Sequence, residues 1–153
     1  MSFDLAALAR AIAAHGPVVR VVVAEARGSA PREPGASMVV WASGFDGTIG
    51  GGALEFEALA EARRRLSAGV DGAAHYPLGP ALAQCCGGAA TLAYERWDDA
   101  RLRSIAEGPL FARPLGPACA PPLAIARALR GARGGAPDLT YVPGDPPWLA
   151  EPM

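Results

Sequence analysis

Val18-Val-Arg-Val-Val-Val-Ala24 is the stretch that decides the fold of this chain. β-branched side chains favour extended backbone, and a nearly continuous apolar run is typical of a strand that is buried on both faces. We therefore predict a central strand here, inside a sheet that other elements cover on both sides. The residues that follow it, 25–36, are rich in glycine and proline and predict a loop at the end of this strand.

The neighbouring patterns supply the rest of a sheet and its helices. Apolar residues at helical spacing predict one helix before the central strand and a second over residues 53–66. β-branched and aromatic residues predict further strands. We expect an α/β fold: a mixed sheet of about four to five strands with flanking helices. The additional strands are predicted at residues 37–41, 73–78 and 89–95, and Gly44–Gly47 is predicted to be a turn.

The character of the chain changes at Gly108, after which prolines are frequent. Proline removes a backbone donor and fixes φ, so it confines much of this region to turns. We predict a domain over residues 1–107 and a Pro/Gly-rich, linker-like tail over residues 108–153. Within this tail we expect one short helix at 123–129 and a short strand near 138–142, but no second core.

Composition bounds the function. The net charge of the 153-residue chain is −1, which gives no electrostatic case for binding nucleic acid or an anionic membrane. No apolar run approaches the ~18 residues of a membrane span. The N-terminus lacks the cationic leader of a signal peptide. Three cysteines without a C-x-x-C pattern fit free thiols in a reducing compartment, so we expect a cytoplasmic protein.

The strongest sign of function is Leu78-Gly-Pro-Ala-Leu-Ala-Gln-Cys-Cys-Gly-Gly88. Paired thiols are soft nucleophiles or metal ligands, and paired glycines allow the backbone to approach a ligand closely. The structural alternative is that both cysteines are small core residues. We expect this stretch to contact a bound cofactor. Its candidate contacts are Gln84, Cys85, Cys86, Gly87 and Gly88.

Two other stretches are candidates for binding an anion. The loop at 25–36 carries Arg27 and Arg32, whose guanidinium groups suit phosphate. Gly50-Gly-Gly52 precedes a predicted helix, where unpaired amides can hold an anion. It matches neither the dinucleotide fingerprint nor the P-loop. The structural alternatives are a surface turn with solvated arginines and a tight strand-to-helix turn.

Three stretches together resemble the N-terminal domain of the XdhC/CoxI family. They are Arg27-Gly-Ser-Ala-Pro-Arg-Glu-Pro-Gly-Ala-Ser-Met38, Gly47-Thr-Ile-Gly-Gly-Gly-Ala-Leu-Glu55 and Leu78 to Gly88, in the same order and spacing. The resemblance covers roughly residues 1–100 and is greatest to the XdhC branch. Ala53 stands where the CoxI-like branch often has cysteine, and Ala83 where many members have glycine.

The resemblance implies an accessory protein of xanthine dehydrogenase rather than an enzyme. Such proteins bind the molybdenum cofactor, a pterin dithiolene that carries molybdenum and a phosphate. They hold it while a cysteine desulfurase installs a sulfido ligand, and then deliver it to the large subunit of xanthine dehydrogenase. They are usually homodimers. The expected contacts are Cys85 and Cys86 to the metal, Gln84 to the pterin edge with Gly87 and Gly88 beside it, and Gly51, Gly52, Arg27 or Arg32 to the phosphate.

Family members usually continue into a Rossmann-like domain, which is absent from this chain, so we expect a fragment or a short member and assign no nucleotide-binding role. Two other functions stay open. One is an enzyme that uses Cys85 or Cys86 as nucleophile or sulfur carrier; it needs a nearby base, and neither His15 nor His75 lies in a partner motif. The other is a structural dimerisation module.

Overall fold

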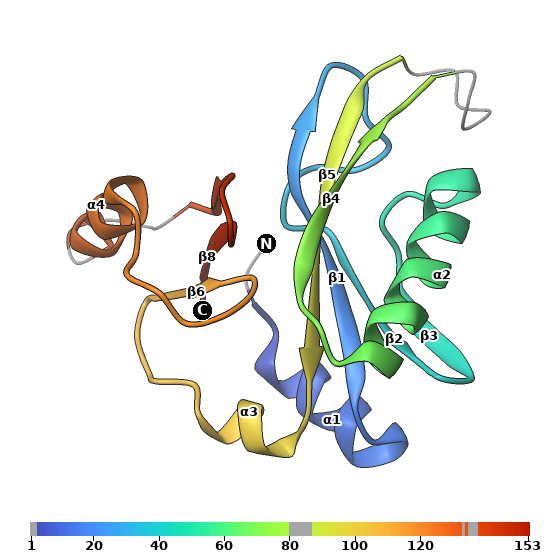
Figure 1. Ribbon diagram of the computed structural model, residues 1–153, viewed down its shortest axis with the longest axis horizontal. Coiled ribbons are helices and arrows are strands. Elements are labelled where there is room, and N and C mark those ends of the chain that lie inside the picture. Colours follow the sequence, from blue (N-terminus) through green and yellow to red (C-terminus); the bar gives the residue numbers. More distant parts are fainter. Residues whose placement is uncertain (1–2, 80–86, 133, 135–137) are drawn as a thin grey trace.

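The computed structural model describes residues 3–79, 87–132, 134 and 138–153. Its centre is a five-stranded sheet in the order β3-β2-β1-β5-β4, as Figure 1 shows. Every pairing in this sheet is antiparallel. The strands are β1 (Val18–Arg27), β2 (Ser37–Trp41), β3 (Gly44–Gly47), β4 (Gly72–Pro77) and β5 (Ala89–Trp97).

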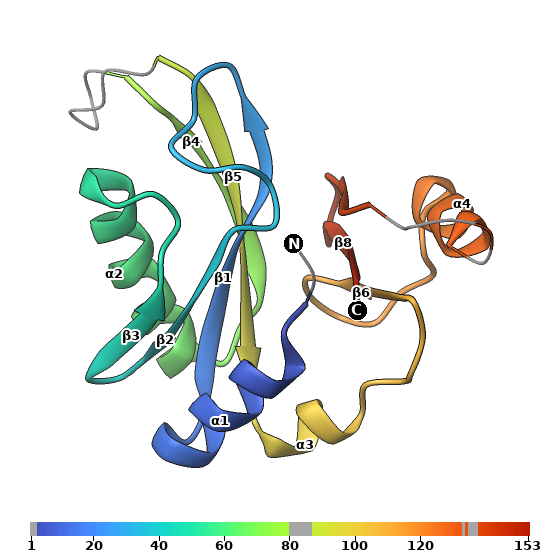
Figure 2. The ribbon, with the colours of Figure 1, turned by 180° about the vertical axis from the view of Figure 1, so that it is seen from behind.

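The central strand is confirmed. β1 is the middle strand of the sheet, and residues 18–24 are all buried. One face of the strand packs under α2 (Gly52–Ala68), with Val21 and Val23 in the same core as Leu54. The other face packs against the C-terminal part of the chain, where Val22 contacts a different core. Figures 1 and 2 show these two layers on opposite sides of the sheet.

The predicted fold class is confirmed, with two differences in detail. The sheet is antiparallel rather than mixed, because each strand runs opposite to the strands beside it. Gly44–Gly47, predicted as a turn, is the edge strand β3. The reversal lies one step earlier, at residues 42–43, and Trp41 pairs with Gly44 across it. Two further helices, α1 (Leu5–His15) and α3 (Asp99–Arg103), lie together at one end of the sheet.

The region after Gly108 is folded, and the expectation of a linker-like tail without a core is wrong in this respect. It forms a second sheet of order β6-β8-β7 and a helix. Its core joins Leu110, Ile125 and Trp148. Prolines end strands here, where a missing donor disrupts little of the ladder. The elements are β6 (Leu110–Pro114), α4 (Leu123–Gly131), β7 (Thr140–Val142) and β8 (Trp148–Pro152); we call residues 110–152 the C-terminal layer. The domain division at residue 107 stays a prediction.

A buried ionic network joins the two sheets. Arg20 of β1 donates to both carboxylate oxygens of Glu151 on β8, at 2.8 and 2.7 Å. Arg113 of β6 donates to Glu95 of β5 at 2.6 and 2.7 Å and to Glu151 at 2.6 Å. None of the four side chains is more than 7% exposed, and their charges sum to zero. The network fixes the C-terminal layer on the central sheet.

None of the helices in the described part of the chain has the length and apolar character needed to span a membrane.

Candidate functional site

The three motif stretches meet at one end of the sheet. The C-terminal end of β1, the N-terminal end of α2 and the adjoining ends of β4 and β5 all lie there (Figure 1). The loop after β1 contacts both other stretches: a Cβ built on Gly28 would lie 3.3 Å from the Cα of Gly88, and one built on Gly50 would overlap the ring of Pro31. We call this region the motif end; it comprises residues 27–36, 49–52, 78–79 and 87–88.

Gly88 is required for the closest of these approaches. A Cβ at this position would lie 2.5 Å from the carbonyl oxygen of Arg27 and would also overlap that of Ser29. The neighbouring Gly87, at φ 65°, pairs with Ser29 in an isolated parallel bridge. The amide of Leu78 donates to the carbonyl of Gly88 at 2.7 Å. The glycine pair therefore anchors one end of the Cys-Cys stretch against the loop after β1.

An apolar layer supports the motif end from below. Ala36, Ile49, Leu54 and Leu78 come from the three motif stretches and α2, and each is at most 1% exposed in one continuous core. Apolar burial of this kind is the main source of stability for such loops. The sequence pattern did not indicate that Ile49 and Leu78 would share a core.

Gln84, Cys85 and Cys86 lie outside the described residues, so their predicted contacts stay predictions. The chain leaves the described part after Gly79 and re-enters it at Gly87. Among the residues that the structure describes, no group of three or more His, Cys, Asp and Glu side chains could hold a metal ion.

The two predicted arginines differ in their availability. Arg32 is held by its own neighbour, because its Nε and one Nη both donate to the Glu33 carboxylate, at 3.2 and 3.1 Å. That exposed contact raises the pKa of the Arg32 guanidinium. Arg27 donates only its Nε, to Glu25 at 3.1 Å, and its side chain is 74% exposed. Within the described residues, both Nη groups of Arg27 have no acceptor, so Arg27 is the better partner for an anion.

The glycine loop before α2 already holds one carboxylate. Glu55 accepts hydrogen bonds from the amides of Ile49 and Gly51, at 3.1 and 2.9 Å, and from the Thr48 hydroxyl at 2.6 Å. Burial acts to raise the pKa of Glu55, but these hydrogen bonds outweigh it and the pKa is lowered. Of the predicted phosphate donors, the Gly51 amide is therefore occupied. Sequence reasoning missed this role of Glu55, because it stands four residues after the N-cap Gly51, one more than in a capping box.

A cleft of about 750 Å³ lies between the central sheet and the C-terminal layer. Its floor includes a row of polar side chains across three strands: Glu25 on β1 pairs in register with Thr91 on β5, which pairs with His75 on β4. His75 Nδ1 lies 3.2 Å from the Thr91 hydroxyl oxygen. Arg27 lines the same cleft. Sequence reasoning singled out Arg27 but not this row.

A β-bulge puts the row on this face. Val23 pairs with Leu92 and Glu25 with Thr91, so Ala24 is the extra residue on β1. Without the bulge, alternation would direct Glu25 to the same side as Val23, into the core under α2. Bulges of this kind re-aim side chains and are common beside active sites.

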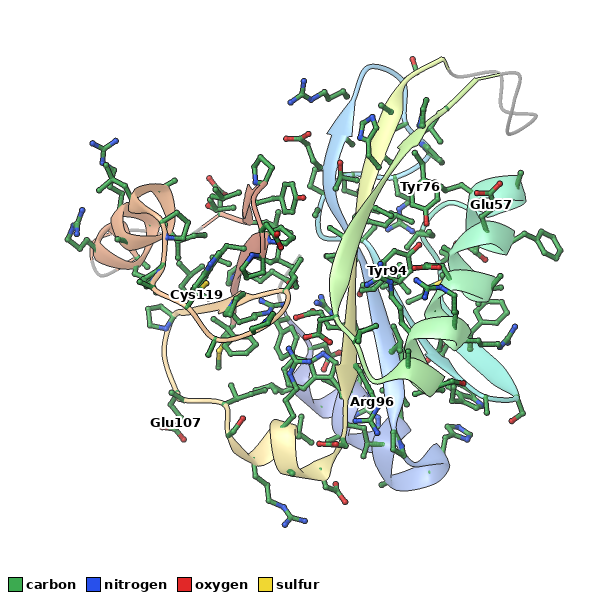
Figure 3. All side chains as sticks on the ribbon, viewed as in Figure 1. Glu57, Tyr76, Tyr94, Arg96, Glu107 and Cys119 are labelled. Carbon is green, nitrogen blue, oxygen red and sulfur yellow. The ribbon has the colours of Figure 1, made fainter. Side chains whose placement is uncertain are left out.

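The opposite face of the sheet carries a pair of tyrosines under α2, labelled in Figure 3. The hydroxyl oxygens of Tyr76 and Tyr94 are 2.5 Å apart. Burial raises the pKa of both, so both phenols are neutral over the physiological range. The described cysteine, Cys119, lies in the C-terminal layer, where the Trp148 indole donates to its sulfur at 3.4 Å.

Comparison with known families shows what the first half of the chain is similar to. Residues 11–77 match the XdhC and CoxI family. This range includes the central strand, the loop with Arg27 and Arg32, the glycine loop and α2. The resemblance predicted from the sequence is thus confirmed over this region.

A solved structure shares the fold over two thirds of this chain. It is described as a xanthine dehydrogenase from Bacillus halodurans, and it matches with a TM-score of 0.58 at 21% sequence identity. The match covers 67% of this chain and 34% of that one, so the chain spans about a third of its length. No curated protein matches the chain significantly.

The described part of the predicted site is therefore assembled in one place. Gly51, Gly87, Gly88 and the backbone of Arg27 all lie at the motif end, and Gly52 begins α2 beside them. Of the two histidines considered as a base, His75 lies on β4 in contact with Thr91.

Proposed function

We propose that this XdhC/CoxI chain takes part in the maturation of xanthine dehydrogenase as a carrier of the molybdenum cofactor. It binds the cofactor at the motif end, holds it for sulfuration by a cysteine desulfurase, and passes it to the large subunit of the dehydrogenase. The observation that carries this proposal is the convergence of the three motif stretches through the close backbone contacts of Gly28 with Gly88 and Gly50 with Pro31.

The described residues fit such a cofactor in two respects. The free Nη groups of Arg27 suit its phosphate, because guanidinium groups bind phosphate with two parallel hydrogen bonds. Among the described residues, a Cβ built on Gly51 or Gly87 would meet no atom within 4 Å, so the backbone is open toward them. Such openness allows a ligand to approach the main chain. In this proposal the thiols of Cys85 and Cys86 contact the metal, which prefers soft sulfur ligands, and Gln84 contacts the pterin.

Glu55 modifies the earlier expectation for the phosphate. Its carboxylate sits on the Gly51 amide and would repel an anion there. The phosphate would therefore bind at Arg27, with the glycine loop shaping the backbone beside it. A homodimer is part of the same proposal, as is a cytoplasmic location.

The test is retention of the cofactor. The chain is incubated anaerobically with molybdenum cofactor and passed through gel filtration, and the co-eluting pterin is oxidised and measured by fluorescence. The wild type is compared with Cys85→Ala, Cys86→Ala and a matched control, Cys119→Ala, which removes the thiol in the C-terminal layer.

Retention by the wild type and the Cys119 variant, with loss in either of the other variants, is the expected result. Equal retention by all four proteins would remove the paired thiols from the site. No retention by the folded wild type would refute the proposal that this chain carries the cofactor.

A further inference from the structure

The cleft between the two sheets has a floor with a specific chemical character. Glu25, Thr91 and His75 form one polar row on this sheet face, and Gly72 and Ala73 of β4 continue the floor. The lining also includes the charged residues Arg65 and Asp71. The C-terminal layer forms the other wall, with Tyr141 and residues 143–147. A volume of about 750 Å³ lies within the range of small-molecule sites.

The cleft exists because the C-terminal layer covers only part of the sheet. The row of Arg20 and Glu95 is sealed by the ionic network, and the next row, with Val22 and Ala93, is sealed by Leu149 and its neighbours. The Glu25 row comes next and lines the cleft. The bulge at Ala24 directs Glu25 to the cleft side of the sheet, the side of Val22, whereas regular alternation would direct it to the side of α2.

The lining selects a flat ligand with hydrogen-bond donors at one edge. A carboxylate such as Glu25 only accepts hydrogen bonds, and its two oxygens match two neighbouring N–H groups. The Thr91 hydroxyl can donate or accept beside it. Ala73 of β4 and the ring of Tyr141 offer apolar surfaces for the faces of a heterocycle.

The ion pair of Glu25 and Arg27 can give way to a ligand. Their side chains are 37% and 74% exposed, so the pair itself contributes little to stability. The donor edge of a ligand can replace Arg27 at the Glu25 carboxylate.

We propose that this cleft binds the pterin half of the cofactor, with the aminopyrimidine edge on Glu25 and Thr91. The inference rests on the proposed function and adds a second part to the site, on the face of the sheet opposite α2. A pterin presents an amino group and a ring N–H side by side, which is the donor pair that a carboxylate accepts.

The test uses 6-hydroxymethylpterin, a fluorescent pterin without metal, sulfur or phosphate, titrated into the full chain. The wild type binds and its fluorescence changes on saturation. Glu25→Gln replaces one carboxylate oxygen by an NH₂ group, which cannot accept a hydrogen bond from the donor edge of the pterin. Loss of a hydrogen bond to a charged group weakens binding by about tenfold or more. Thr91→Val keeps the side-chain volume but loses the hydroxyl, and weakens binding about threefold.

The matched control is Glu57→Gln, which makes the same chemical change on α2, across the sheet from the cleft (Figure 3). It leaves the affinity for the pterin unchanged. Far-ultraviolet circular dichroism of each variant reports its folding, and Glu25 is exposed enough that its variant folds.

Two results would overturn this inference. One is an absence of pterin binding by the wild type, and the other is the same affinity in the Glu25, Thr91 and Glu57 variants. Either result leaves the carrier proposal to its own test, since the cofactor can still be retained in gel filtration and lost in the cysteine variants. Equal retention by the wild type and the cysteine variants, with the pterin titration as expected, would instead refute the role of the thiols alone.

Discussion

Replacing Arg113 by methionine tests the reasoning about the ionic network that joins the two sheets. Arg113 makes three charge-assisted hydrogen bonds of 2.6–2.7 Å, two to Glu95 and one to Glu151. Methionine fills much of the same volume and makes none of them. Arg20 stays bound to Glu151 through two short hydrogen bonds. Glu95 keeps only a 3.4 Å contact to Arg20 and a 3.8 Å contact to Arg101.

The expected loss is large because Glu95 is fully buried. Breaking a buried pair by removing one partner leaves an uncompensated charge and costs about 3–5 kcal/mol. The matched control is Arg103→Met. Arg103 is 80% exposed and lies 4.0 Å from Asp99, so its removal costs at most about 1 kcal/mol. The measurement is the free energy of unfolding of each variant in urea.

A second substitution separates charge from packing. In the double variant Arg113→Met with Glu95→Leu, the network contains one arginine and one glutamate and is again neutral. We expect the double variant to be less destabilised than the sum of the single variants, by about 1–3 kcal/mol. A loss below about 1 kcal/mol for Arg113→Met, or strict additivity in the double variant, would refute the reasoning.

Three further predictions follow from the same contacts. Gly88→Ala forces a Cβ against the carbonyl of Ser29, so thermal denaturation should show a loss of about 2 kcal/mol or more. Gly131→Ala, whose Cβ would meet no described atom within 4 Å, should show no loss. Glu55→Gln should cost about 1–2 kcal/mol in the same measurement, because the amides and hydroxyl before α2 lose a charged acceptor; full stability would contradict this. Burial alone would raise the pKa of Glu151, but its two arginine partners hold it well below its ordinary value of 4.5. Stability from this group is therefore complete above pH 4.5 and is lost as the pH falls toward about 2; unfolding midpoints that do not change between pH 6 and pH 3 would contradict it.

The sequence was sufficient for the parts of the fold that rest on local patterns. The run from Val18 to Ala24 indicated the central strand, because only a strand covered on both sides accepts so many adjacent apolar residues. The helix predicted at residues 53–66 is α2 at Gly52–Ala68. The loop with Arg27 and the glycine loop were both recognised as candidate site elements. They lie together because the first leaves the end of β1 and the second leads into α2 at the same end of the sheet.

The C-terminal layer could not be predicted in the same way, because its stability depends on contacts distant in the sequence. β6 and β8 pair with each other although more than thirty residues separate them, and β8 also pairs with β7. Arg113 and Glu151 look like ordinary polar residues until the network buries them. The prolines that suggested a linker end these strands instead.

The ionic network and the cleft are two consequences of how the C-terminal layer sits on one sheet face. Arg20 and Glu95 lie one row from Val22 and Ala93, and the Glu25 row comes next. If the network weakens, the wall of the cleft that carries Tyr141 is no longer held over the sheet. Variants of Arg113 should therefore lower pterin affinity without touching the cleft, whereas Glu25→Gln should lower affinity without lowering stability. That opposite pattern in two measurements distinguishes a residue that positions the cleft from one that contacts its ligand.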